Sequence, residues 1–416
     1  MTERTAPTGP TEPSGSGPAE PAAPAEPAGS AGSARPDGPS ASAEPSGPAG
    51  SARSGGPSAP AGPSGSAAAR SGGADDGRAA PGGAGSRLAP PVAAAGAVGP
   101  RPLVRPRTWP RTFADRLTAP LPGVRAMARL AREGAIRPRA EGLHDIPMLP
   151  FEPEPLPPVG PAGAAVTWAG HASWVIRTGG LTVLTDPVWS RRILGTPARI
   201  TPVGVRWEDL PPVDAVVISH NHYDHLDAPT IRRLPRTTPV LAPAGLGRWF
   251  RRRRFTRVTE LDWWESAELD GVRFHFVPAH HWSRRGLTDT CRTLWGGWML
   301  TDPQGRRTYF AGDSGYGPCF AEIADRLPGI DLALLPIGAY APRWWLRDVH
   351  MDPEEAVRAF LDLGARHMAP MHWATFVLSA EPVREPLTRL HAAWERAGLD
   401  RARLWDLPVG GSRVLE

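Results

Sequence analysis

The sequence lacks several features that would place the protein in particular classes. None of its 416 residues is lysine, so all 47 basic side chains are arginine, and its first hundred residues contain no Phe, Trp or Tyr. A stretch without large apolar side chains cannot offset the entropy of ordering its backbone. We therefore expect residues 1–100, which are rich in Pro, Gly, Ala and Ser, to form a disordered low-complexity tail.

Cysteines and long apolar runs are also scarce. Cys291 and Cys319 are the only cysteines, which excludes a disulfide framework and fits a reducing compartment. No run of 18 apolar residues is present, so no spanning helix is expected, and the N-terminus lacks the apolar segment of a secretory signal. These absences predict a cytoplasmic protein that touches a membrane at its periphery at most.

The folding part of the chain has a mildly basic charge balance, with 41 arginines against 34 acidic residues after residue 100. This excess is compatible with anionic partners such as phospholipid headgroups. The run Arg251–Arg254 is either a solvated helix end or a docking point for anionic lipid. Nucleic acid is not an expected partner, because the sequence shows no stronger basic asymmetry than this run. A homodimer is left open.

Short apolar runs begin at Ala164 and alternate with helical patterns. An extension over residues 101–163, with a helix from about Arg111 to Glu133, is expected to pack on a core domain of residues 164–416. Strands first cluster and then alternate with helices in each half of that domain, which predicts two sheets packed face to face with helices outside. The expected strands cover 164–170, 173–178, 181–187, 213–220, 272–281, 296–302, 307–313 and 331–338, and the expected helices cover 228–234, 244–252, 318–327, 353–363 and 385–397.

The densest chemical motif is SHNHYDHLD at 219–227, directly after a buried strand pattern. Metal binding needs neutral imidazoles and ionised carboxylates that converge on one point. The spacing of His220 and His222 places both rings on one side of an extended segment, while Asp224 and His225, past the bend, can face a second ion. The motif therefore predicts a metal site rather than a polar surface turn.

Three further candidate ligands, His281, Asp313 and His372, come at the ends of other apolar runs. With the turn motif they make five histidines and two aspartates, enough for two metal ions with three ligands each and one bridging carboxylate. Imidazole and carboxylate ligands without cysteine favour zinc, with iron or manganese left open. A scaffold built on one structural zinc is the non-enzyme alternative, but it needs only four ligands.

Several longer strings resemble the N-acyl-phosphatidylethanolamine-hydrolysing phospholipase D family of metallo-β-lactamase-fold hydrolases. They are WAGHASWVI (168–176), LTDPVWSRR (184–192), SHNHYDHLD (219–227), PAHHW (278–282), YFAGDSGYG (309–317), IGAYAPRWW (337–345), VHMDPEEAV (349–357) and MHWATF (371–376). The resemblance implies an α/β fold, the four-layer αββα metallo-β-lactamase sandwich, with two Zn²⁺ per chain. It implies one zinc on His220, His222 and His281, the other on Asp224, His225 and His372, and Asp313 as the bridge.

The same resemblance implies a phospholipid substrate. A metal-bridging hydroxide would cleave a phosphodiester bond of N-acyl-phosphatidylethanolamine-type lipids, with Asp224 or Asp313 orienting the nucleophile and His350 assisting near the phosphate. Arg343 is expected to contact that phosphate as a bidentate donor. The ligand set would serve a lactone or ester hydrolase equally well, since the hydroxide attacks carbon and phosphorus alike. Other small-molecule substrates therefore remain open.

Residues around the predicted ligands have two interpretations each. Asp186 either orients an imidazole N–H or simply ends a strand at the Asp-Pro step. His171 is expected beside the metal centre as a supporting residue rather than a ligand. Adjacent side chains of a strand point to opposite faces, so only one of His280 and His281 can bind metal, and the resemblance favours His281. No base adjoins Ser173 or Ser314 that would indicate a catalytic triad.

Overall fold

The computed structural model describes residues 107–135 and 142–416. The predicted disordered tail, residues 1–100, lies outside the described residues. Of the predicted extension, 101–163, the structure describes 107–135 and 142–163. None of the helices in the described ranges has the length and the apolar character needed to cross a bilayer.

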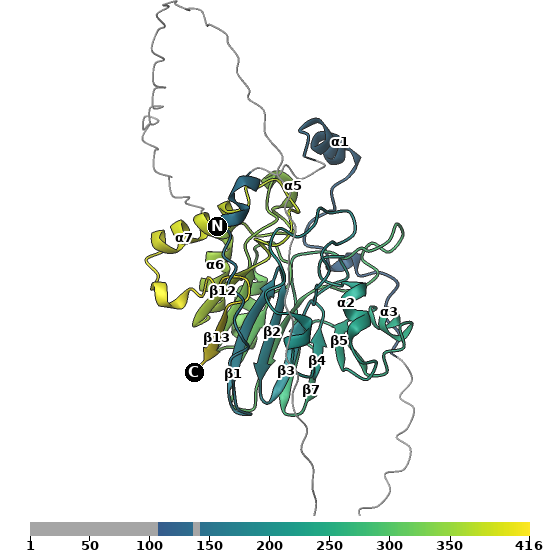
Figure 1. The fold of residues 1–416 in the computed structure, drawn as a ribbon. Coiled ribbons are helices and arrows are strands. Elements are labelled where there is room, and N and C mark those ends of the chain that lie inside the picture. The colour runs from purple at the N-terminus through teal and green to yellow at the C-terminus, as the bar shows by residue number, and fades with distance from the viewer. Residues whose placement is uncertain (1–106, 136–141) are drawn as a thin grey trace, which may run out of the picture. The chain divides into compact units, whose positions relative to one another are not determined.

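Within the described residues the strands form two sheets (Figure 1). The first sheet has the strand order β13-β1-β2-β3-β4-β5-β6, and its strands are β1 (Ala164–Gly170), β2 (Ser173–Thr178), β3 (Leu181–Thr185), β4 (Ala215–Val217), β5 (Val240–Pro243), β6 (Val258–Leu261) and β13 (Ser412–Leu415). The second has the order β12-β11-β10-β9-β8-β7, and its strands are β7 (Ser266–Leu269), β8 (Val272–Val277), β9 (Gly297–Thr301), β10 (Arg307–Phe310), β11 (Leu332–Pro336) and β12 (His367–Met371).

Helices cover the outer sides of both sheets. The helices are α1 (Val124–Arg132), α2 (Ala228–Arg233), α3 (Gly247–Arg251), α4 (Cys319–Arg326), α5 (Arg343–Leu346), α6 (Pro353–Leu363) and α7 (Glu385–Arg396), with 3-10 turns η1 (Ala114–Arg116), η2 (Leu143–Met148), η3 (Trp207–Asp209) and η4 (Arg401–Arg403). In Figure 1, α2 and α3 lie by β5, and α6 and α7 lie by β12. Aromatic side chains of α6 and α7 pack together, with the rings of Phe360 and Trp394 4.8 Å apart.

Alternation along the strands of the first sheet divides its side chains between two apolar clusters. Trp174 and Ile176 of β2 join the large cluster that also holds Phe274 and Trp298 of the second sheet. Val175, between them, joins a separate cluster with Ile231 of α2 and Phe250 of α3. Since successive residues of a strand point to opposite faces, both faces of this sheet are buried. The arrangement confirms the predicted four-layer α/β sandwich.

The N-terminal helix prediction is wrong in its extent. A continuous helix from Arg111 to Glu133 is not formed, because Pro120 and Pro122 interrupt the chain between the short turn η1 and helix α1. Phe113 is 1% exposed in the main apolar cluster, whereas Met127 of α1 is 44% exposed, so the two do not share a face. The five helices expected in the core domain do form, with ends that differ by three residues or fewer.

Candidate metal centre

The candidate ligands meet because several strands end at the same place. Strands β3, β4 and β5 are parallel, as are β10, β11 and β12, so the carboxyl ends of each set lie together. Asp186 follows β3, Asp313 follows β10 and His372 follows β12. Asp186 has a φ of 32° and His372 a φ of 65°, so the chain turns sharply as soon as these strands end. These turns direct polar side chains back into one region.

One group of side chains contains three of the predicted histidines. The Nδ1 atom of His222 lies 2.9 Å from Nε2 of His220 and 3.2 Å from Nε2 of His281. Oδ2 of Asp313 is 3.8 Å from Nε2 of both His220 and His281. Each residue of the group offers a ligand atom within 4.8 Å of the others, which is the spacing that one metal ion requires.

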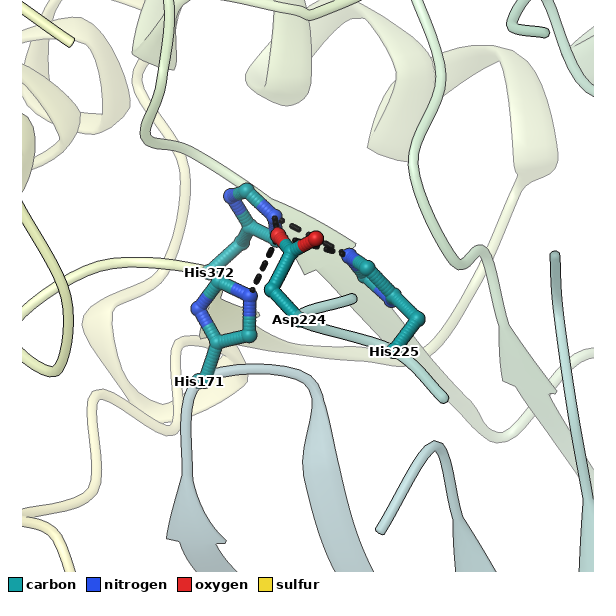
Figure 2. Close-up of side chains that lie close together, drawn as sticks. All are labelled: His171, Asp224, His225 and His372. Atoms are coloured by element: carbon teal, nitrogen blue, oxygen red, sulfur yellow. Dashed lines mark hydrogen bonds and ion pairs between the residues drawn. The ribbon is translucent and has the colours of Figure 1, made fainter. Parts of the chain in front are cut away.

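A second group adjoins the first and holds the other predicted ligands with one addition, His171 (Figure 2). Nε2 of His225 lies 3.2 Å from Nε2 of His372, and Oδ2 of Asp224 lies 3.4 Å from the former and 3.5 Å from the latter. His171, 1% exposed, places its Nε2 3.0 Å from the same Asp224 oxygen. The structure thus puts His171 in contact with a candidate ligand, as a residue that supports Asp224.

Asp313 contacts both groups at once. Its Oδ2 atom is 3.1 Å from Nε2 of His225, and its Oδ1 atom is 3.1 Å from Nε2 of His372, in addition to its contacts with the first group. The carboxylate therefore lies between the two groups. This position suits the bridging role predicted for it.

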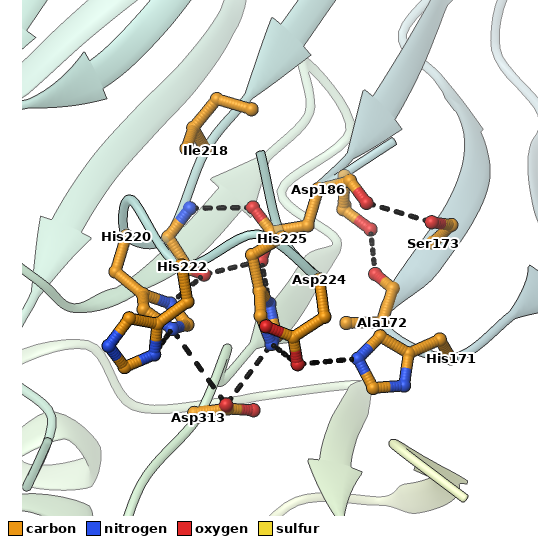
Figure 3. Close-up of polar contacts among 12 residues, drawn as sticks. His171, Ala172, Ser173, Asp186, Ile218, His220, His222, Asp224, His225 and Asp313 are labelled. Atoms are coloured by element: carbon orange, nitrogen blue, oxygen red, sulfur yellow. Dashed lines mark hydrogen bonds and ion pairs between the residues drawn. The ribbon is translucent and has the colours of Figure 1, made fainter. Parts of the chain in front are cut away.

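Asp186 fixes the orientation of two of the imidazoles (Figure 3). Its carboxylate lies 2.7 Å from Nδ1 of His225 and accepts hydrogen bonds from the backbone N–H of Ser219 at 2.7 Å and from the Ser219 hydroxyl. Because that hydroxyl gives its proton to Asp186, it accepts from Nδ1 of His220 at 2.9 Å. Protons on both Nδ1 atoms leave the Nε2 lone pairs of His220 and His225 directed into the centre.

The third fixed ring is that of His281, whose Nδ1 lies 2.9 Å from the carbonyl oxygen of Val349 and so donates to it. Its Nε2 atom therefore carries a lone pair, and this lone pair faces the same region as Nε2 of His220. Acceptor nitrogens that converge on one point without donors between them match the coordination requirement of a divalent cation. The residues present therefore fit a metal ion in each group.

Burial keeps most of these imidazoles neutral. It lowers the pKa of His222 to about 3, helped by the neighbouring His281, and lowers the pKa of His281 to about 4. Burial acts in the same direction on His372, but Asp313 and Asp224 outweigh it and raise the pKa of His372 to about 9. The carboxylates thus attract positive charge to the second group, and a bound metal ion would supply it.

His350 lies beside the centre, with its ring 5.1 Å from the ring of His281 and its Nδ1 atom buried without a partner in the described residues. Arg343 lies behind it and donates from Nη1 to the His350 carbonyl at 2.7 Å. The Arg343 guanidinium also pairs with Glu355 and lies 3.3 Å from Asp352, the two residues of the capping box of α6. The structure therefore places Arg343 against His350 and α6, and its contact with a substrate phosphate stays a prediction.

A cavity of about 150 Å³ opens beside the histidines. His222, His281 and His350 line one end, and Trp282 and Trp345 line its apolar part. Residues 117–122 of the N-terminal extension form another wall, and Leu346, Asp348 and Val349 complete the lining. Neither this wall nor the hydrogen bonds of Ser219 and Val349 were part of the sequence prediction. The one sequence feature that could have indicated these contacts is the position of Ser219, directly before His220 in the turn motif.

The side chain of His280 points away from the metal centre. A Cβ atom added to Gly317 would come within 1.9 Å of the His280 ring, so this ring packs directly on that glycine. His281 is the one of the pair that faces the candidate ligands, at 2% exposure. The structure thus brings together all seven predicted ligands.

Comparison with known proteins identifies the class to which this fold and site belong. The β-lactamase superfamily domain matches residues 182–373. An uncharacterised protein of Mycobacterium tuberculosis is 45% identical over 60% of this chain and 68% of its own length. A structure from Veillonella parvula, described as a possible metal-dependent hydrolase, matches 61% of this chain and 99% of its own with a TM-score of 0.51 at 16% identity, which supports the fold. The chain belongs to the β-lactamase superfamily and is a metal-dependent hydrolase.

Within that class the chain is similar to named phospholipases. N-acyl-phosphatidylethanolamine-hydrolyzing phospholipase D 1 of Caenorhabditis elegans is 37% identical over 55% of this chain and 69% of the relative. The mitochondrial N-acyl-phosphatidylethanolamine-hydrolyzing phospholipase D of Saccharomyces cerevisiae is 36% identical over 56% of this chain and 52% of the relative. These findings confirm the predicted resemblance to this branch of the superfamily.

Proposed function

We propose that the protein is a two-zinc phospholipase of the D type that cleaves N-acyl-phosphatidylethanolamine-type lipids to an N-acylethanolamine and phosphatidic acid. The observation that carries the proposal is the pair of His/Asp groups joined by Asp313, with an apolar cavity beside His222 and His281 of the first group. The names of the worm and yeast relatives support the choice of substrate. We further propose that it acts in the cytoplasm at the surface of a membrane.

Zinc bound at the two groups would activate a water molecule and neutralise charge on the phosphoryl oxygens. The side chains of the protein perform the remaining tasks. Asp313 and Asp224 are ionised, because positive charge at the centre outweighs the effect of burial and holds their pKa values well below the ordinary range. His225 carries that charge in the metal-free chain, and a bound cation would replace it, so both carboxylates can orient the attacking water. His350 lines the cavity, and burial lowers its pKa well below the ordinary value, so its neutral ring can hold the phosphate or the leaving oxygen through an N–H group.

The cavity walls suit a lipid. Leu117 and Leu121 of the extension and Trp345 of α5 form apolar surface directly beside His222 and His350. An acyl chain that enters between them would leave water, which favours binding by about 25 cal/mol for each Å² of apolar surface removed. This arrangement would hold the phosphodiester of the same lipid next to the histidines.

The test is a substrate panel for the zinc-loaded protein. It compares N-acyl-phosphatidylethanolamine with an acyl lactone and with bis(p-nitrophenyl) phosphate, and it includes Asp313→Asn as the inactive reference. We expect the lipid to be hydrolysed with the highest kcat/KM and Asp313→Asn to lose at least about 100-fold in kcat. Lactone turnover without lipid cleavage would instead support the lactone or ester hydrolase alternative and contradict the proposal.

A further inference from the structure

An arginine-rich surface lies over α3 and the loop 283–292, and the mechanism makes no use of it. We define this arginine surface by Arg248, Arg252, Arg253, Arg254, Arg284 and Arg285. Within residues 107–135 and 142–416, none of the six forms an ion pair with a carboxylate. By contrast, Arg251 of the same helix pairs with Glu260 at 2.9 Å. The surface therefore carries an excess of positive charge, with no carboxylate of the described residues at ion-pair distance from these six side chains.

Aromatic rings hold two of these arginines, Arg253 and Arg285, next to each other. The guanidinium carbon of Arg253 lies 3.6 Å from the centre of the Trp249 ring, and that of Arg285 lies 5.5 Å from the same ring and 4.1 Å from Tyr223. Burial lowers the pKa of Arg253, and the nearby charges of Arg232 and Arg252 lower it further. Like charges gathered at this spacing repel one another, and an anionic partner would relieve that repulsion.

Hydrogen bonds connect the arginine surface to the turn 219–227, which carries four of the candidate metal ligands. Nη1 of Arg285 donates to the carbonyl of Asn221 at 3.1 Å, and the Tyr223 hydroxyl donates to the carbonyl of Arg285 at 2.8 Å. Trp282, three residues before Arg285, lines the cavity beside the histidines. The positive charge therefore adjoins the place where a substrate would enter.

One apolar side chain projects from the same loop. Leu287 is 90% exposed, the largest exposed fraction among the large hydrophobic residues described. A leucine at the tip of a loop between arginines can enter the acyl layer of a bilayer while the arginines remain at the headgroups. A nucleic acid backbone would match the charge but offers no apolar layer for Leu287.

We propose that the arginine surface docks the protein on an anionic phospholipid bilayer, with Leu287 inserted, so that the cavity opens toward the lipids. This inference rests on the proposed function, since it supplies that site with a bilayer substrate. Each arginine near an anionic bilayer strengthens binding roughly fivefold. The attraction weakens as salt rises, because the Debye length falls from about 10 Å at 0.1 M to about 3 Å at 1 M.

The experiment is co-sedimentation of the full zinc-loaded chain with vesicles that contain phosphatidylcholine alone or mixed with phosphatidylglycerol. These vesicles hold no N-acylated lipid, so binding is measured without catalysis. The double variant Arg248→Ala/Arg252→Ala should bind the mixed vesicles roughly 30-fold more weakly than the parent, since two arginines are lost. The matched control is Arg384→Ala/Arg413→Ala, which removes two exposed arginines from α7's N-terminal end and from β13. It should bind as the parent does.

Leu287→Ser serves as a second probe and should also reduce binding to the mixed vesicles. Zinc content and Tm are measured for every variant, to show that each is folded. Equal loss of vesicle binding in the two double variants, or no binding by the parent, would overturn the proposal. Tighter binding of the parent to a DNA duplex than to the mixed vesicles at equal salt would also overturn it.

These results can be separated from those for the proposed function. A parent that hydrolyses N-acyl-phosphatidylethanolamine in detergent micelles but ignores the mixed vesicles would overturn the docking surface alone. A parent that binds the vesicles through these arginines but cleaves no phosphodiester would leave the docking surface supported and overturn the proposed function.

Discussion

Asp186 shows how one residue outside the two groups of ligands can still orient a histidine in each. It is fully buried, and its carboxylate holds His225 directly and His220 through the Ser219 hydroxyl. Burial raises its pKa, although the hydrogen bonds from His225 and Ser219 oppose that rise. One carboxylate thus sets the tautomer of a histidine in each candidate group. Such outer partners commonly determine metal affinity.

Asp186→Asn should therefore weaken metal binding by about 10-fold to 100-fold without removing a ligand. The amide can donate where the carboxylate accepts, so the Nδ1 protons of His220 and His225 lose their fixed positions. Zinc affinity is measured by competition with a chromophoric chelator. The matched control is Asp214→Asn, because Asp214 accepts a backbone bond from Thr182 at 2.8 Å and takes no part in either ligand group. Equal zinc affinity in Asp186→Asn and the parent would contradict this role.

At the scale of elements, the N-terminal extension forms part of the cavity as well as part of the core. Phe113 is buried in the main apolar cluster, and its backbone N–H donates to the carbonyl of Cys291 at 2.7 Å. Arg116, three residues later, lies 3.4 Å from Asp262 and stacks over Trp263. These contacts hold the segment 117–122 that follows them in place as the cavity wall.

Phe113→Ala should consequently affect substrate binding as well as stability. The loss of a buried Phe costs roughly 3–5 kcal/mol in the free energy of unfolding, and release of the adjacent wall should raise KM for the lipid several-fold with a smaller change in kcat. Phe360→Ala is the matched control, because Phe360 is equally buried but packs against Trp394 of α7. It should lose comparable stability and keep its KM. An equal KM in both variants would show that the extension does not shape the cavity.

The sequence predicted the parts of the site that follow from strand ends. Four of the seven candidate ligands lie within six positions of the turn motif, and His281, Asp313 and His372 each follow an apolar run. The strands before these three, β8, β10 and β12, run in the same direction, so their carboxyl ends lie at one edge of the sheet. The layered fold followed from the order of strands and helices. Five short strands were not predicted. The edge strands β6, β7 and β13, of four residues each, are only partly buried, and β5 and β12, of four and five residues, are mostly buried but too short to show a clear pattern.

Contacts between distant segments could not be predicted. Ser219 meets Asp186 only because β3 and β4 are neighbours in the sheet, and Phe113 meets Cys291 across 178 positions of sequence. The break in the N-terminal helix has a local cause, since Pro120 and Pro122 lie inside the predicted range. The apolar positions of that segment favour one helical face, but the two prolines are the stronger signal and end the helical pattern.

For the whole molecule, the metal ions should contribute to folding. Five histidines and two aspartates converge in a buried region, and their mutual repulsions and unsatisfied lone pairs remain if no cation binds. A ligand present at 100 to 1,000 times its Kd stabilises the folded state by roughly 3–4 kcal/mol. Metal binding and folding are therefore expected to be coupled in this chain.

Removal of metal with a chelator should lower Tm by roughly 5–10 °C, and added zinc should restore it. The measurement is a thermal melt of the full chain before and after dialysis, with zinc counted by mass spectrometry. The variant Asp313→Asn, which lacks the carboxylate between the two groups, should show a smaller shift. A Tm that does not change when the bound metal leaves would contradict the coupling.

In the proposed reaction, water attacks phosphorus in an N-acyl-phosphatidylethanolamine. The decisive measurement is hydrolysis of this lipid by the zinc-loaded protein in ¹⁸O-labelled water, with both products examined by mass spectrometry. We expect one labelled oxygen in the phosphate of phosphatidic acid and none in the N-acylethanolamine. Label in the carboxyl group of a released fatty acid, with the phosphodiester intact, would show attack on an ester carbon and contradict the proposed reaction.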